Sequence, residues 1–229
     1  MSETEQTQNP ISIDVVSDVM CPWCYIGKRR LEQALSLLGD TVAVDVRWRP
    51  YQLDPTLPKE GKDRRLYLEQ KFGGPEKAKE IYSRIEDAGR AEDLDFKFSA
   101  IKLSSNTLDA HRVIRWSSSE NSAVRDALIE RLFQFYFMEG GNLGDTEALV
   151  QVATDAGMDG SVVAALLATD KDRAEVEQEI AMAQQMGVTG VPCFIINNKY
   201  AVMGAQEAGH IAEAVRQAAA ETGSTAKQA

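Results

Sequence analysis

The sequence predicts an α/β protein in which a large all-helical insertion separates a βαβ half from a ββα half. β-branched and alternating apolar residues occur near both ends of the chain, whereas amphipathic helical patterns fill the middle. The helical block is an insertion because β character resumes after it. We assign residues 10–56 and 187–221 to one α/β domain, 57–186 to the helical insertion domain, and 1–9 and 222–229 to flexible tails.

The N-terminal half contains the elements of a βαβ unit. Residues 11–16 are rich in β-branched side chains and predict a strand that ends near Asp18. Apolar residues then recur at helical spacing from Tyr25 to Leu38, before a capping Gly39. Residues 41–53 alternate between apolar and polar side chains, which predicts a second strand with one packed face. The short link favours a right-handed parallel unit.

The middle of the chain shows helical periodicity and no strand pattern. Glycine, proline and aspartate at the segment ends support the boundaries of the predicted helices, which are 62–72, 75–90, 107–118, 123–138, 146–156, 160–167 and 170–186. Within this block, the aromatic cluster of Phe133, Phe135, Tyr136 and Phe137 is expected to pack in the core, because aromatic residues of an amphipathic helix usually do.

The C-terminal half predicts a hairpin and a final helix. Residues 190–196 and 199–203 are two β segments joined by Asn197 and Asn198, a dipeptide suited to a tight turn. Pro192 stands at the start of the first of these strands, where a proline is tolerated. A helix is expected over 206–220.

Composition narrows the classes of function. A chain of 229 residues with 44% hydrophobic residues can build a core, and its formal net charge of −10 argues against nucleic acid or an anionic membrane surface as a partner. The first ten residues are polar and acidic, unlike a secretory signal, and no apolar run reaches the length of a membrane span. We therefore predict a cytoplasmic protein without a membrane partner.

Two thiols three residues apart, Cys21 and Cys24, lie where the first strand meets the first helix. We expect the pair in the first helical turn, where free N–H groups and the helix dipole favour a thiolate. Cys21 is nearest the helix end and is predicted to attack, whereas Cys24 is predicted to be buried and to resolve. In the cytoplasm such a pair is more often redox-active than structural.

The residues around the thiols fit this role. Pro22 suits the first helical position, because its missing N–H would have no partner there. Trp23 is expected to form an apolar shoulder beside the thiols. Asp18 lies three residues upstream, and its charge would oppose ionisation of Cys21 if the two groups are close.

A structural zinc site is the alternative for a pair of this spacing. Zinc usually takes four ligands, and only Cys193, His111 and His210 remain, without a second close pair. We therefore predict no metal site and no resident organic cofactor.

The segment from Ser17 to Lys28, the Val191-Pro192 pair and the helical insertion together resemble a DsbA-family thioredoxin-fold oxidoreductase, most similar to its cytoplasmic FrnE-like subgroup. The resemblance covers nearly the whole chain. It implies that the α/β domain has a thioredoxin fold and that the peptide bond before Pro192 is cis. It also implies that Val191 faces the Cys21–Cys24 pair and offers its backbone to a thiol substrate.

Asn106 and His111 are candidate substrate-binding residues. For His111, a titration near neutral pH suits a proton shuttle, although a lone helical histidine is more often structural. For Asn106, a role as a helix cap or loop residue is the alternative to the substrate contact that family likeness suggests.

The predicted function is exchange between the Cys21–Cys24 dithiol and a peptide or small-molecule disulfide, with glutathione as one conceivable thiol partner. A related class of enzymes, the kappa-class glutathione transferases and 2-hydroxychromene-2-carboxylate isomerases, carries serine where this chain has Cys21. A non-catalytic binding module is a further alternative, which the intact dithiol argues against. The sequence leaves open the substrate, the direction of electron flow and the oligomeric state.

Cys193, directly after Pro192, has two interpretations. A free cysteine in a strand is most often a small buried apolar residue, and alternation along the strand would turn it away from the dithiol. The other hypothesis is a third thiol that exchanges with the pair.

Overall fold

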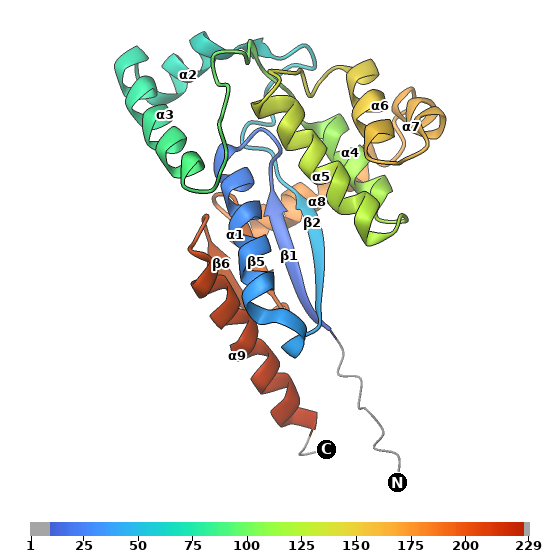
Figure 1. The fold of residues 1–229 in the computed structure, drawn as a ribbon. Helices are drawn as coiled ribbons and strands as arrows, with labels where there is room; N and C mark the ends of the chain where they lie inside the picture. Colours follow the sequence, from blue (N-terminus) through green and yellow to red (C-terminus); the bar gives the residue numbers. More distant parts are fainter. Residues whose placement is uncertain (1–9, 227–229) are drawn as a thin grey trace.

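A four-stranded sheet in the order β2-β1-β5-β6 forms the centre of the α/β part of this computed structural model (Figure 1), which describes residues 10–226. The strands are β1 (Ile11–Ser17), β2 (Val44–Pro50), β5 (Cys193–Ile196) and β6 (Tyr200–Met203). β1 pairs in parallel with β2 and antiparallel with β5, which in turn pairs antiparallel with β6. The predicted βαβ and ββα halves therefore share one sheet, and the predicted fold class is confirmed.

Helices cover both faces of this sheet. α1 (Pro22–Leu38) and α9 (Ala208–Ala226) lie together over one face, where Ile13 and Val15 of β1 pack against Leu31 and Ile211. The opposite face meets α8 (Arg173–Gln185), with Val16 among the packed residues. Alternation along β1 therefore sends Val15 and Val16 into two different cores.

Apart from α8, which covers the sheet, the insertion lies mainly towards the carboxyl end of β1 (Figure 1). Before α8 it contains α2 (Arg64–Phe72), α3 (Pro75–Arg90), α4 (Leu108–Ser117), α5 (Ser122–Phe137), α6 (Thr146–Asp155) and α7 (Gly160–Leu167). Asp63, Asn121, Asp145 and Asp159 accept backbone N–H groups at the starts of α2, α5, α6 and α7. These caps explain why the helices begin where the sequence changes from polar to amphipathic.

The expectation that the insertion lacks β structure is wrong. Two short strands, β3 (Lys62–Asp63) and β4 (Leu103–Ser104), pair antiparallel. Strands of two residues are too short to show an alternating pattern, which is why periodicity missed them. For the same reason the helix predicted from residue 62 begins instead at Arg64.

Two other boundaries also differ from the prediction. A short 3-10 turn, Gly39–Thr41, precedes β2, so the strand predicted over 41–53 is shorter. The last helix continues to Ala226, so residues 222–226 are not a tail; the predicted tail residues 1–9 and 227–229 lie outside the described residues. Contacts from the hairpin explain the extension, because Asn197 bonds to Thr222 and Tyr200 bonds to Glu221.

The insertion and the start of α1 share the largest apolar cluster. Phe133, Tyr136 and Phe137 are fully buried in it, as predicted, and Phe135 is partly buried at its edge. The ring of Tyr25 in α1 stacks on Phe133, with 4.8 Å between ring centroids and 6° between planes. The helical turn that carries the two thiols is thus packed directly against the insertion.

Candidate active site

Cys21 and Cys24 stand at the amino-terminal end of α1. Cys21 is the N-cap residue in extended conformation, with Pro22 at the first helical position as predicted. The expectation that both thiols lie within the first turn therefore holds for Cys24 but not for Cys21, which immediately precedes the helix. The Cys21 side chain caps no backbone group of the helix, so its sulfur is available for other contacts.

Both thiols are buried, with 3% of Cys21 and 1% of Cys24 exposed, while Trp23 between them is 39% exposed. Burial raises the pKa of the Cys24 thiol well above its usual value, and the hydrogen bond with Cys21 and the charge of Cys21 raise it further. Cys24 therefore keeps its proton when Cys21 ionises. A buried thiol with a raised pKa is a poor attacking group, and the assignment of attack to Cys21 and resolution to Cys24 stays a prediction.

The loop before β5 closes the site on one side. The peptide bond between Val191 and Pro192 is cis, and the Cys21 thiol donates to the Val191 carbonyl over 3.7 Å between sulfur and oxygen. Val191 thus presents backbone to the attacking sulfur, while Pro192 lies against α1.

Gly27 is a site residue that the residue-by-residue analysis did not single out. A Cβ atom at Gly27 would lie 2.8 Å from Cγ of Pro192 and 3.3 Å from the ring of Phe194. Only glycine therefore lets the Pro192 loop approach the helix this closely. The available signal was a glycine in the second turn of a predicted helix, where it costs stability unless a close packing partner requires it.

Asp18 organises the chain before Cys21. Its buried carboxylate accepts the N–H groups of Met20 and Leu53 over 3.3 and 2.8 Å, and its carbonyl accepts the Cys21 N–H over 2.9 Å. His111 lies beside it, with 3.7 Å between Nε2 and Oδ1 of Asp18. The carboxylate thus joins the Cys21 loop, the segment after β2 and α4.

The two candidate substrate-binding residues hold loops together. His111 is 3% exposed, and its Nε2 donates to the Tyr51 carbonyl over 2.9 Å. The Asn106 amide donates to the Leu57 carbonyl over 2.6 Å, and its oxygen accepts the Leu108 N–H over 2.9 Å. Asn106 thereby does what the loop interpretation predicts, joining the segment after β2 to the start of α4.

Arg64 is a buried cation that the sequence analysis missed. It is 4% exposed and donates to the hydroxyls of Tyr82 and Tyr136, each over 2.9 Å. Within residues 10–226 no carboxylate pairs with it. Burial raises the pKa of Tyr82, the Arg64 charge opposes that rise, and the charge of Cys21 adds to it. Tyr82, the partner of Arg64, therefore lies within electrostatic range of the attacking thiol.

Cys193 belongs to the other face of the sheet. It is fully buried, pairs with Val16 of β1, and packs with Tyr51, Ala183 and Val188. Burial raises the pKa of its thiol. The structure thus agrees with the packing hypothesis for Cys193.

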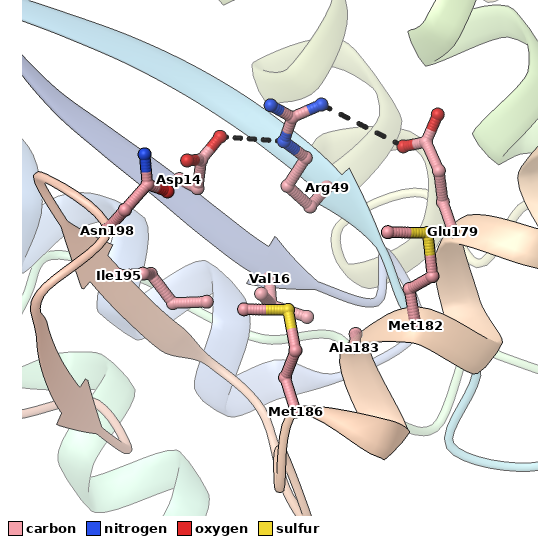
Figure 2. A pocket seen from close by; sticks show the side chains of 9 residues that line it. All are labelled: Asp14, Val16, Arg49, Glu179, Met182, Ala183, Met186, Ile195 and Asn198. Carbon is pink, nitrogen blue, oxygen red and sulfur yellow. Dashed lines mark hydrogen bonds and ion pairs between the residues drawn. The ribbon is translucent and has the colours of Figure 1, made fainter.

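A cavity of about 280 Å³ opens on this same face (Figure 2), and its lining includes Asp14, Arg49, Glu179, Met182 of α8 and Met186 directly after it. It contains neither Cys21 nor Cys24. In the described part of the chain, no three His, Cys, Asp or Glu side chains gather as a metal site requires, and no helix is long and apolar enough to cross a bilayer.

Comparison with known proteins finds related chains over nearly the full length. Residues 12–216 match the family described as "DSBA-like thioredoxin domain". The probable DsbA oxidoreductase SCO1869 from Streptomyces coelicolor is 32% identical, with a TM-score of 0.84 over 92% of this chain and 91% of that one. The uncharacterized protein YwbO of Bacillus subtilis (strain 168) is 26% identical over 82% of this chain and 88% of its own.

A 2-hydroxychromene-2-carboxylate isomerase shares the fold at 15% identity, with a TM-score of 0.68 over 93% of this chain and 98% of that one. At that identity the likeness concerns the fold, so the chemistry must be argued from the site residues themselves.

Proposed function

Because this chain belongs to the DSBA-like thioredoxin domain family, we propose that it is a thiol-disulfide oxidoreductase whose working groups are Cys21 and Cys24. The observation that carries the proposal is the unequal placement of the two sulfurs. Cys21 immediately precedes α1 and its thiol contacts the Val191 carbonyl, whereas Cys24 lies inside the first turn, where burial raises its pKa strongly.

The chemistry proceeds through a mixed disulfide. The Cys21 thiolate attacks one sulfur of the substrate disulfide, that S–S bond breaks, and the first substrate thiolate leaves. Cys24 then attacks the Cys21 sulfur and releases the second substrate thiolate, which leaves a Cys21–Cys24 disulfide. Run in reverse, the same steps oxidise a substrate dithiol.

The surrounding residues support these steps. Pro22 starts the helix, Trp23 offers exposed apolar surface, and Val191 with Pro192 forms a backbone wall for an extended substrate. Substrate contact by Asn106 and His111 stays a prediction, since the hydrogen bonds of both residues hold neighbouring loops. The proposal needs no resident metal or organic cofactor. It includes glutathione as a small thiol partner and a cytoplasmic location.

Glutathione-dependent isomerisation or transfer is the second candidate, favoured by the shared fold of the 2-hydroxychromene-2-carboxylate isomerase. That class is expected to carry serine where this chain has Cys21. Its reaction therefore uses no pair of thiols, whereas this chain has both Cys21 and Cys24. The dithiol makes disulfide exchange the better account.

Parallel assays distinguish the candidates. The protein should catalyse reduction of insulin disulfides by dithiothreitol, and Cys21→Ser should lose this activity. It should show no glutathione conjugation of chloro-dinitrobenzene above the uncatalysed rate. Conjugation that persists in Cys24→Ala, without any insulin reduction by the parent protein, would instead establish the transferase class.

A further inference from the structure

In the resolving step Cys24 must lose a proton before it can attack. This inference rests on the proposed oxidoreductase function. Cys24 is 1% exposed, and burial is the largest cause of its raised pKa. It must nevertheless lose its proton to attack the mixed disulfide on Cys21. Because solvent does not reach the thiol directly, a neighbouring group has to accept that proton.

Ser17 is placed to do so. It is the last residue of β1 and shares strand parity with Ile13 and Val15, so it faces α1 rather than α8. Its hydroxyl is buried and has no hydrogen-bond partner among the residues described. Burial raises the pKa of Cys24, and Ser17 is one of the two neighbours that act in the opposite direction and lower it. Strand parity thus turns an unpartnered hydroxyl towards the side of the sheet that holds the thiol which must lose a proton.

A small cavity continues from this hydroxyl. It has a volume of about 10 Å³, and Ser17, Trp48 and His111 are among the residues that line it. That volume suits one water molecule, provided that polar partners are present. The Ser17 hydroxyl and the His111 imidazole, both part of its lining, supply those partners.

His111 can receive a proton. A carbonyl only accepts hydrogen bonds, so the bond to Tyr51 O requires the hydrogen on Nε2, which leaves Nδ1 as the acceptor of the neutral ring. The Asp18 carboxylate lies 3.7 Å from Nε2, so an acidic group stands beside the ring that the Tyr51 carbonyl orients.

A way to solvent exists on the far side of His111. A second cavity, of about 90 Å³, is lined by His111, Arg49, Arg115 and Glu179. Together with Asp18, these are the charged groups that face the imidazole. Arg115 pairs with Glu179. Figure 2 shows that Arg49 pairs with Asp14, over 2.6 Å, and with Glu179. The Arg49 side chain is 42% exposed, so this cavity reaches the surface.

We propose that Ser17, one water in the small cavity and His111 form a proton relay that serves Cys24 during the resolving step. The Cys24 proton passes to the Ser17 oxygen as the Ser17 proton passes to the water, and the water gives a proton to Nδ1 of His111. The electron pair left on Cys24 forms the bond to the Cys21 sulfur. The bond between Cys21 and the substrate sulfur breaks, and its electron pair leaves with the substrate thiolate.

The two steps can be separated with dithiobis-nitrobenzoate, an aromatic disulfide that releases a yellow thiol at each step. Mixed with the reduced protein in a stopped-flow instrument, it should give a first phase for attack by Cys21 and a second for resolution by Cys24. In Ser17→Ala we expect an unchanged first phase and a second phase slowed about 100-fold, the lower end of what a positioned proton acceptor contributes.

The pH profile identifies the cause. Without the relay, resolution depends on solvent hydroxide, so the second phase of Ser17→Ala should rise nearly in proportion to hydroxide concentration. Ser17→Thr keeps the hydroxyl and should restore the rate. His111→Gln can still donate to Tyr51 but cannot accept the proton, and should slow the second phase by about 100-fold, the lower end of the range for general acid–base groups.

Ser104→Ala is the matched control, because Ser104 also has a buried hydroxyl without a partner in the described chain but lies in β4. It should leave both phases unchanged. An unaltered second phase in Ser17→Ala and His111→Gln, or equal slowing in Ser104→Ala, overturns the relay. Failure of the unmodified protein to show a first phase would instead refute the oxidoreductase function itself.

Discussion

The dithiol and Cys193 lie on either side of the Val191-Pro192 bond, and they show that burial alone does not make a thiol reactive. All three thiols are at most 3% exposed. Cys21 nevertheless meets the Val191 carbonyl and the end of α1, while Cys24 lies near Ser17 and Asp18. Cys193 packs into an apolar cluster between the sheet and α8. The dithiol thus has polar groups close to its sulfur atoms, whereas Cys193 is surrounded by apolar side chains.

The two regions also differ in how the protein holds them. The dithiol turn is fixed by Gly27, which admits Pro192, and by ion pairs between α1 and α5. Cys193 is held by strand pairing and apolar contact, which leave a thiolate there without stabilisation. Substitutions in the first region should therefore change exchange chemistry, and those in the second should change stability alone.

The largest effect is expected from the two sulfurs of the dithiol. Cys21→Ser should reduce disulfide exchange to the uncatalysed rate, because no nucleophile remains. Cys24→Ser should retain attack and accumulate a covalent adduct on Cys21, because resolution is lost. Intact-protein mass spectrometry after incubation with oxidised glutathione measures the adduct, and its accumulation in Cys21→Ser instead would reverse the two roles.

A smaller effect should follow from Gly27→Ala. The added methyl group would lie 2.8 Å from Pro192, so the loop must move away from α1. We expect slower exchange and a free energy of unfolding lower by about 1–3 kcal/mol, as for other overpacked sites.

Gly209→Ala is the control for this change, since Gly209 is also helical and a Cβ there meets nothing within 4 Å. It should keep full exchange activity and unfold at the same or slightly higher denaturant concentration. If both variants behave alike, close packing at Gly27 does not position the Pro192 loop.

Substitution of Glu130 tests whether contacts from α5 stabilise α1, the helix that carries the dithiol. It accepts bonds from Tyr25, Lys28 and Arg29 of α1 over 2.7, 2.7 and 2.6 Å. Glu130→Gln should lower the free energy of unfolding by about 1–3 kcal/mol, because the partly buried Lys28 loses a charged partner. Glu80→Gln, in an exposed pair with Arg84, should cost at most about 0.5 kcal/mol.

The same contact predicts a pH dependence. Burial would raise the pKa of Glu130, but hydrogen bonds from Lys28 and Tyr25 and the Lys28 charge outweigh it and lower the pKa to about 2. A carboxyl group whose pKa is lowered in the folded state stabilises the fold at pH values above its pKa in the unfolded chain, which is near 4.3. This contribution is lost as the pH falls from there towards 2. The free energy of unfolding, measured with urea between these pH values, should therefore fall more steeply with pH in the parent protein than in Glu130→Gln.

The smallest effect is expected from Cys193→Ala. Loss of one buried sulfur should lower the free energy of unfolding by about 1 kcal/mol, comparable to one buried methylene with its cavity. Exchange rates should stay within twofold of the parent protein. A larger loss of exchange activity would revive the hypothesis of a third working thiol.

The difference between the dithiol and Cys193 could largely be predicted from the sequence, because it depends on local patterns. Spacing placed Cys21 and Cys24 at a strand–helix junction, and strand parity anticipated that Cys193 would face away. Gly27 and Arg64 were missed because their importance arises from contacts with Pro192 and Tyr82, which are far along the chain. The cavity lined by Ser17 and His111 draws residues from β1, β2, α4 and α5, so no local pattern predicts it.

Differential alkylation of the three cysteines tests the central claim most directly. The protein is equilibrated with a graded series of glutathione redox buffers, free thiols are labelled, and peptides are mapped by mass spectrometry. We predict that Cys21 and Cys24 lose label together, as one disulfide, across a single transition, while Cys193 remains a free thiol throughout. A disulfide that includes Cys193, or independent transitions for Cys21 and Cys24, would contradict the account.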